Sequence, residues 1–393
     1  MSWESVKLED ISSGIQTGPF GSQLHQSDYT EDGTPVVMPK DLIGGKISEQ
    51  SIARVGAEHV QRLQRHIIQN GDILYSRRGD VGRCAFATER ETGWLCGTGC
   101  LRVTVNPRVA DKKFVFYQLQ QSSTIDWVEK HAVGATMLNL NTKILSNIPV
   151  FLPPIETQHR IADILSAYDD LIENNRKQIK LLEEAAQRLY KEWFVDLRFP
   201  GHVHTKITDG VPEGWKRRKL VDIAQVQYGY AFDGSLFNSQ KIGTPIIRIR
   251  NIPQGQTEDY TPENVDSQYL VYNGDIIVGM DGEFHINTWA GDTAYLVQRT
   301  CRIKALTSDL NGFLLWAIYE PIKYFEKTVV GATVAHLGKK HIDTVEILVP
   351  TEKFYLPFKS LFEARLLLMN QNRALAEARD RLLPKLMSGE VEV

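Results

Sequence analysis

The sequence predicts an α+β protein in which two similar mixed α/β domains are separated by an antiparallel coiled coil of two long helices. The first observation is an internal repeat, in which segments of the first half return in the same order at an offset that shrinks from 212 residues (3 to 215) to 197 (133 to 330). The second is a heptad pattern that follows each copy. The matched segments are Trp3 with Trp215, 33–37 with 243–247, 70–74 with 273–277, and 133–136 with 330–333.

These patterns divide the 393 residues into five segments. They are a first globular domain (1–153), a first long helix (154–199), a linker (200–214), a second globular domain (215–352) and a second long helix (353–393). In the globular domains, short β-branched runs separated by Asn-Gly turns predict strands, with strands of the second domain around 245–250, 275–279 and 345–349. One helix is expected in 111–130 and another near 309–326.

Apolar residues alternate at spacings of four and three over residues 157–197, and the same spacing returns over 355–387. Each stripe contains one polar seam residue, Asn175 in the first and its repeat-mate Asn372 in the second, a device that fixes partner and register in coiled coils. The alternative for each stripe is an amphipathic helix that packs on its own domain. Each helix begins where its own domain ends, which favours antiparallel pairing of the two.

Composition and motifs exclude several classes of protein. The apolar runs are too short to cross a membrane, and four cysteines in 393 residues fit a reducing cytoplasm. The net charge is −3, so no global basic field indicates nucleic-acid binding. We find no glycine-rich nucleotide loop, no methyltransferase tetrapeptide and no paired Cys/His spacing for zinc, and therefore predict no catalytic residue and no metal site.

Several motifs occur at the borders of the repeated segments. Pro153-Pro154 is followed by Gln158 and Ile161 at the helix start, and Asn-Gly-Asp-Ile occurs at 70–73 and 273–276. Gly-Ala-Thr turns occur at 134–136 and 331–333. Together these motifs resemble those of the DNA-specificity subunits of type I restriction–modification systems. The second copy departs from the pattern, because Tyr355 and Phe358 replace Gln158 and Ile161.

This resemblance implies a non-catalytic subunit that binds double-stranded DNA in the cytoplasm. Each globular domain would be a target-recognition domain for one half of a bipartite, asymmetric site, and the helices would act as spacer and docking platform. Two methylation subunits would use S-adenosylmethionine, and restriction subunits using ATP and magnesium would join them, so this chain itself would bind no cofactor. Two rival functions are a DNA-modifying enzyme in its own right and a repeat-built adaptor that binds only proteins.

The DNA-binding candidates of the first domain are concentrated in a glycine-punctuated loop after a predicted strand. Arginine can grip a phosphate or read guanine through two parallel donors. The domain has no net charge, so local clusters must carry any binding. The alternative for the loop is a solvated surface. The candidates are Ser76, Arg77, Arg78 and Arg83 in this loop, Lys40 before a second loop, and Gln16 and Gln23 flanking a third.

The corresponding loop of the second domain, 279–284, contains no arginine but does contain Asp281, which could accept from cytosine N4. Arg248 and Arg250 are expected on one face of a strand, next to Asn251, where the alternative is a salt-bridged sheet edge. Tyr228 and Tyr230 could reach base edges, with ordinary structural roles as the alternative. Lys339 and Lys340 are candidate phosphate contacts, or simply surface charge.

The candidates for contact with a methylation subunit lie at the two ends of the first helix. Gln158 is at its start, and Tyr190, Trp193 and Phe194 are near its end. The aromatic residues could equally pack against the second helix or the adjacent domain.

Overall fold

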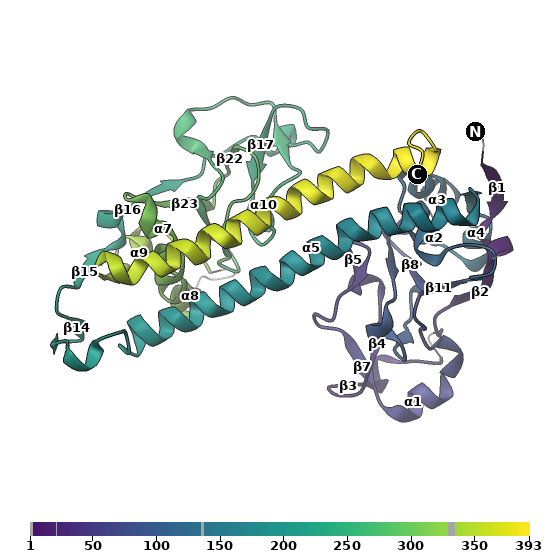
Figure 1. Cartoon of the computed structure of the whole chain (residues 1–393), viewed down its shortest axis with the longest axis horizontal. Helices are drawn as coiled ribbons and strands as arrows, with labels where there is room; N and C mark the ends of the chain where they lie inside the picture. The colour runs from purple at the N-terminus through teal and green to yellow at the C-terminus, as the bar shows by residue number, and fades with distance from the viewer. Residues whose placement is uncertain (1–2, 21, 135–136, 329–334) are drawn as a thin grey trace. The chain divides into compact units, whose positions relative to one another are not determined.

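The computed structural model describes residues 3–20, 22–134, 137–328 and 335–393 (Figure 1). It forms two compact units, Met1–Asp170 with Ala376–Val393, and Leu171–Leu375. Each long helix therefore contributes to both units. The Gly-Ala-Thr turns at 134–136 and 331–333 lie wholly or partly outside the described residues.

The first unit contains a four-stranded antiparallel sheet and a four-stranded mixed sheet, and the second unit repeats this architecture. The antiparallel sheet has the order β2 (Ser12–Thr17), β11 (Cys100–Val105), β8 (Ile73–Ser76), β9 (Cys84–Phe86) in the first unit. Its counterpart has the order β16 (Ala224–Tyr228), β23 (Thr300–Ala305), β20 (Ile276–Gly279), β21 (Ile286–Thr288). Identical strand order in both units confirms the internal repeat.

The mixed sheets are also related. In the first unit the order is β10 (Leu95–Cys96), β4 (Thr34–Val37), β7 (Ala53–Val55), β3 (Tyr29–Thr30), and in the second it is β18 (Tyr260–Thr261), β17 (Thr244–Ile247), β22 (Ala294–Leu296), β19 (Leu270–Val271). Each contains one parallel pair, β4 with β10 and β17 with β22. A two-stranded ladder joins the ends of each domain, β1 (Glu4–Lys7) with β12 (Pro149–Leu152) and β15 (Lys216–Lys219) with β24 (Glu346–Val349).

The helices of the globular domains are shorter than the sequence predicted. Two helices, α2 (Lys112–Leu119) and α3 (Ser122–His131), replace the single helix expected in 111–130, because Gln121 adopts an extended backbone between them. The second unit likewise has two helices in this place, α7 (Asn311–Ala317) and α8 (Tyr319–Thr328). The prediction of one continuous helix was therefore wrong in both copies.

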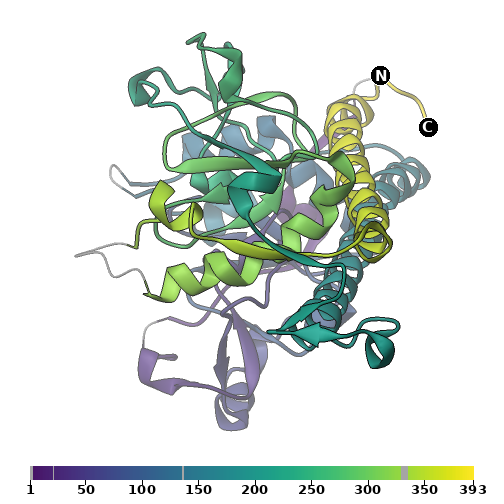
Figure 2. The same cartoon turned by 90° about the vertical axis from the view of Figure 1, so that its left-hand side faces the viewer.

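The two long helices are α5 (Ile155–Tyr190), which continues as a π-helical turn over Lys191–Val195, and α10 (Glu352–Ser388). They run side by side within each unit (Figures 1 and 2). In the second unit, Asn175 Nδ2 lies 3.5 Å from Gln371 Oε1, and Arg365 Nε donates to Glu183 Oε1 at 2.7 Å.

One residue number rises as its partner falls, so the helices are antiparallel, as predicted. The seam residues Ile161, Leu165 and Ile172 are buried, so the apolar face of the heptad stripe lies in the packed interior. Burial of this face explains why the helices pair. Among the described residues no helix is long and apolar enough to span a membrane.

Candidate functional site

A loop follows β8 in the first domain and β20 in the second, and both loops have the same backbone arrangement. The Arg77 amide donates to the Gly99 carbonyl at 2.8 Å, and the Met280 amide donates to the Arg299 carbonyl at 2.9 Å. A second backbone hydrogen bond also holds each loop. The Gly79 amide donates to the Leu138 carbonyl in the first domain, and the Gly282 amide donates to the Ala335 carbonyl in the second, both at 3.1 Å.

These bonds define two corresponding corners of the molecule. The first corner comprises Arg77, Arg78, Gly99 and Asn139, and the second comprises Met280, Asp281, Arg299 and His336. Arg78 pairs with Asn139 across an antiparallel bridge, as Asp281 does with His336. The backbones match position by position, so any functional difference between the corners comes from their side chains.

The first corner presents arginines without a carboxylate partner. The Arg77 guanidinium lies over the Phe20 ring, 5.1 Å from its centroid, and burial lowers the pKa of this guanidinium. Arg78 is exposed, and in the described part of the chain its side chain has no partner. Ser76 is buried, and its hydroxyl donates to the Arg78 carbonyl at 3.1 Å, so it shapes the turn. Arg83 is held by Asp80 at 2.7 Å.

The second corner has a different arrangement of charges. Asp281 accepts from Arg299 Nη1 at 2.6 Å through one carboxylate oxygen and hydrogen-bonds His336 through the other. The Asp281 side chain is only 15% exposed, whereas that of Arg299 is 66% exposed. Arg299 is therefore the accessible member of this ion pair, and the sequence did not single it out. Arg299 directly precedes β23, which pairs with β20, so it lies across from the 279–284 loop and not within it. This position is the sequence feature that could have identified it.

The prediction that Arg248 and Arg250 lie on one face of a strand was wrong. Strand β17 ends at Ile247, and a 3₁₀ turn over Ile249–Asn251 follows. Asn251 Oδ1 accepts from the Arg248 amide at 2.8 Å, which caps the turn and diverts the chain from the strand direction. Arg250 is ion-paired with Asp259, and the Arg248 guanidinium lies 5.4 Å from the centroid of the Phe237 ring.

Most of the remaining polar candidates also have internal partners. Lys40 Nζ donates to the Ser51 carbonyl at 2.9 Å. Gln16 accepts from Arg102 Nη2 at 3.3 Å, and Gln23 Oε1 accepts from the Phe20 amide at 3.1 Å. Lys339 is ion-paired with Asp343 at 2.7 Å, whereas Lys340 is exposed. Lys340 is therefore the freer of the two lysines for a phosphate contact.

The two candidate tyrosines differ in accessibility. Burial raises the pKa of Tyr228, and its hydroxyl has no hydrogen-bond partner among the described residues. Tyr230 is 37% exposed, with its ring 5.2 Å from that of Tyr269. Only Tyr230 offers an open aromatic face.

The predicted partner contacts Gln158, Tyr190 and Phe194 have little accessible surface. Gln158 is buried, donates to the Pro153 carbonyl at 2.8 Å and accepts from the Asp111 amide at 3.0 Å, so it anchors the start of α5. Phe194 is buried with its ring 4.9 Å from Phe313, and Tyr190 lies beside both. Tyr190 and Phe194 thus pack against the second domain and helix α10, which is the alternative that the sequence left open for these aromatic residues.

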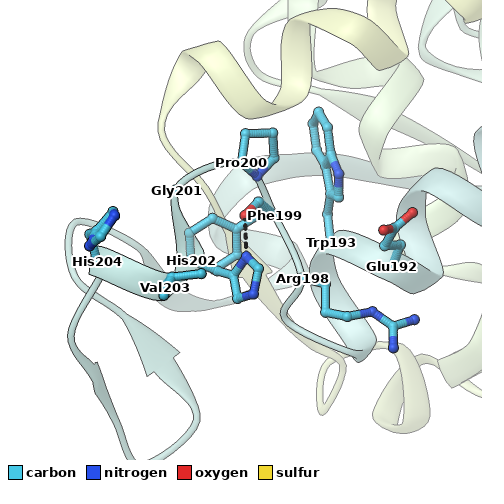
Figure 3. A pocket seen from close by; sticks show the side chains of 9 residues that line it. All are labelled: Glu192, Trp193, Arg198, Phe199, Pro200, Gly201, His202, Val203 and His204. Atoms are coloured by element: carbon cyan, nitrogen blue, oxygen red, sulfur yellow. Dashed lines mark hydrogen bonds between the residues drawn. The ribbon is translucent and has the colours of Figure 1, made fainter.

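Trp193 also packs on α10, with its ring 5.9 Å from Phe354 and 6.3 Å from Phe358. In addition it lines an open pocket of about 480 Å³ at the end of α5 (Figure 3). Arg198 and the linker residues Pro200 and His202 contribute to the lining. His202 Nδ1 is held 2.9 Å from the Phe199 carbonyl. Trp193 is therefore a partner candidate that borders a cavity.

The cysteine thiols are covered by the packed interior. All four cysteines are buried, and burial raises the pKa of Cys84, Cys96 and Cys301 to about 12, so these thiols stay protonated at neutral pH. Among the residues with described positions, no group of three His, Cys, Asp or Glu side chains could hold a metal ion.

Two copies of one mixed α/β fold, each followed by a long helix that pairs with the other, define a protein built from two repeated domains with corresponding corners. The sequence matches the family described as type I restriction modification DNA specificity domain over residues 2–184 and 212–353, most of the chain. The chain belongs to this family.

Two relatives are similar over nearly their whole length. The specificity subunit of the type I restriction enzyme MjaIX from Methanocaldococcus jannaschii is 25% identical, over 100% of this chain and 94% of that protein. The specificity subunit of the HindI enzyme from Haemophilus influenzae is 23% identical, over 99% of both. The crystal structure of a type I restriction-modification S subunit from M. genitalium has 17% identity and a TM-score of 0.57, and covers 98% of this chain and 96% of that one, which supports the fold.

Proposed function

We propose that this chain is the sequence-recognition subunit of a type I restriction–modification complex, and that each globular domain reads one half of a bipartite, asymmetric DNA target. The observation that carries the proposal is the pair of corners. The same backbone presents Arg77 and Arg78 in one domain and the Asp281–Arg299 pair in the other. Two domains that share one backbone geometry but present different side chains suit a DNA target whose two halves differ in sequence.

Catalysis and cofactors belong to partner subunits in this proposal. Two methylation subunits would bind S-adenosylmethionine, and restriction subunits would use ATP and magnesium. The buried, protonated thiols of this chain offer no nucleophile and are compatible with a reducing cytoplasm, where the complex would meet DNA.

Docking of a methylation subunit would use the end of α5. Trp193 in its open pocket combines an aromatic surface with Arg198, and partly exposed aromatic and arginine side chains are enriched at protein interfaces. The long helices would serve as the spacer between the two readers.

The proposal is tested by selecting binding sites from random double-stranded DNA with the complex of this chain and its methylation subunits. The expected result is two short specified sequences, different from each other, with unread base pairs between them. A complex that retains DNA without base preference would contradict the proposal. Methyl transfer by this chain alone would also contradict it, in favour of an enzyme, and assembly with proteins but never with DNA would favour an adaptor.

A further inference from the structure

Arg299 occupies a backbone position at which an L-amino acid with a side chain is uncommon. Its φ angle is +67°, in the left-handed region, and the corresponding residue of the first domain is Gly99 with φ +90°. The correspondence follows from the pairing registers, in which Cys100 faces Ser76 and Thr300 faces Gly279. The second domain therefore has an arginine at a turn position that favours glycine, and such backbone outliers cluster at functional sites.

The two domains also place their arginines on opposite strands of the same corner. In the first domain Arg77 follows β8 and faces Gly99, and in the second domain Met280 follows β20 and faces Arg299. In each domain, one of the two residues that face each other across the strands is therefore an arginine. The exchange explains why the loop 279–284 contains no arginine although its corner does.

The surroundings of Arg299 favour a base edge over a phosphate. Asp281 takes only Nη1 of the guanidinium, and in the described part of the chain no partner occupies Nε or Nη2. These two nitrogens form the edge that can donate in parallel to O6 and N7 of guanine. The adjacent carboxylate offsets the positive charge and would repel a phosphate, whereas a guanine edge is neutral and needs only donors.

We propose that Arg299 is the guanine-reading residue of the second domain and that Asp281 positions it. This inference rests on the proposed DNA-recognition function and names a residue and a base for it. The expectation that Asp281 itself accepts from cytosine changes accordingly, because both of its oxygens are already engaged and its side chain is mostly covered.

The test uses complexes of the full chain with its methylation subunits, and base preference measured at each position of sites selected from random DNA. Arg299→Gly should still fold, because glycine accepts the left-handed conformation and Asp281 keeps its hydrogen bond to His336. It should reduce the preference for guanine at one position of one half-site by about tenfold to a hundredfold. Arg299→Lys should lose the same preference, because an ammonium lacks the planar pair of donors.

Lys241→Gly is the matched control. Lys241 is an exposed cation in the same domain with φ +60°, so its replacement removes one positive charge and one left-handed side chain, as Arg299→Gly does. This variant should keep every base preference. Asp281→Asn should keep the guanine preference and steepen the salt dependence, since an amide still accepts from Arg299 but no longer offsets its charge.

Three results would overturn the inference. They are guanine preference retained by Arg299→Gly, an affinity loss that is uniform across sequences with a shallower salt slope, and the same relaxation in Lys241→Gly. If the unmodified complex itself shows no base preference, the proposed function fails, which separates that failure from this one.

Discussion

The two corners differ in charge, although their backbone hydrogen bonds agree within 0.1 Å (2.8 and 2.9 Å, and 3.1 Å in both). The matched positions that differ are Arg77 with Met280, Arg78 with Asp281, and Gly99 with Arg299. In the first corner Arg77 is supported by an aromatic ring, and in the second Arg299 is supported by a carboxylate. The comparison shows that the repeat preserves a backbone frame while the side chains at a few fixed positions differ.

The largest effect is expected from a covered ion pair that both domains contain at the start of β8 and of β20. Arg302 lies 3.9 Å from Asp275 with side chains 8% and 4% exposed, and Arg102 lies 3.6 Å from Asp72 with 15% and 1%. Arg302→Met would leave the Asp275 carboxylate, whose pKa burial already raises, without its covered partner. We expect a loss of about 3–5 kcal/mol in the free energy of unfolding, measured by urea titration.

Lys304→Met is the control for this substitution, since Lys304 lies 3.8 Å from the same carboxylate but is 48% exposed. Its cost should stay below about 1 kcal/mol. Equal losses for the two variants would mean that burial does not govern the strength of this pair.

A second difference between the domains is acid sensitivity. His66 in the first domain is buried, accepts from Arg65 Nε at 3.0 Å through Nε2, and has a pKa lowered to about 4 by burial and by Arg65 and Arg102. Its repeat counterpart is Tyr269, which has no charge to gain. Between pH 6.5 and 4 the unfolded chain binds a proton that the folded first domain does not, so stability is lost as the pH falls.

We expect the first domain to lose roughly 2–3 kcal/mol over this window. The measurement is domain-resolved proteolysis during urea unfolding at pH 7 and pH 4.5. His66→Gln should remove most of this pH dependence. An equal loss in the second domain would show that another group is responsible.

A third prediction concerns affinity at the first corner. Arg77→Ala with Arg78→Ala should weaken binding of the complex to its target by about 1–3 kcal/mol for each arginine that binds a base, because these guanidinium groups have no carboxylate to neutralise them. Titration of the target at two salt concentrations would measure this. Unchanged affinity would exclude the first corner from the interface.

The smallest effect should come from Arg83, whose guanidinium is held by Asp80 with side chains 40% and 57% exposed. Arg83→Ala should change the affinity and the free energy of unfolding by less than about 1 kcal/mol each. A loss as large as that of the Arg77 and Arg78 pair would show that Arg83 leaves Asp80 to bind DNA.

Periodicity and repetition predicted the fold well, because they reflect packing. The heptad stripe predicted α5, α10 and their antiparallel pairing, and the shrinking offset predicted two copies of one domain. Side-chain placement was harder to predict. Arg248 and Arg250 were put on a strand because nothing in the local pattern shows that Asn251 caps a turn there.

Arg299 was missed for a related reason. A contiguous alignment compares loop with loop, whereas the corner is formed across two strands, so an arginine opposite the loop goes unnoticed. Phe194 and Tyr190 suggested a partner surface because the aromatic end of a helix has the same sequence pattern whether another subunit or its own domain covers it.

The central claim is that each domain reads its own half-site through its own corner. The most direct measurement selects binding sites from one random DNA library with two complexes, one carrying Arg77→Ala and Arg78→Ala and the other carrying Arg299→Gly. The account predicts that the two complexes relax base preference in different halves of the same bipartite target, and that each leaves the other half unchanged. Relaxation of the same half by both complexes, or of both halves by either one, would contradict it.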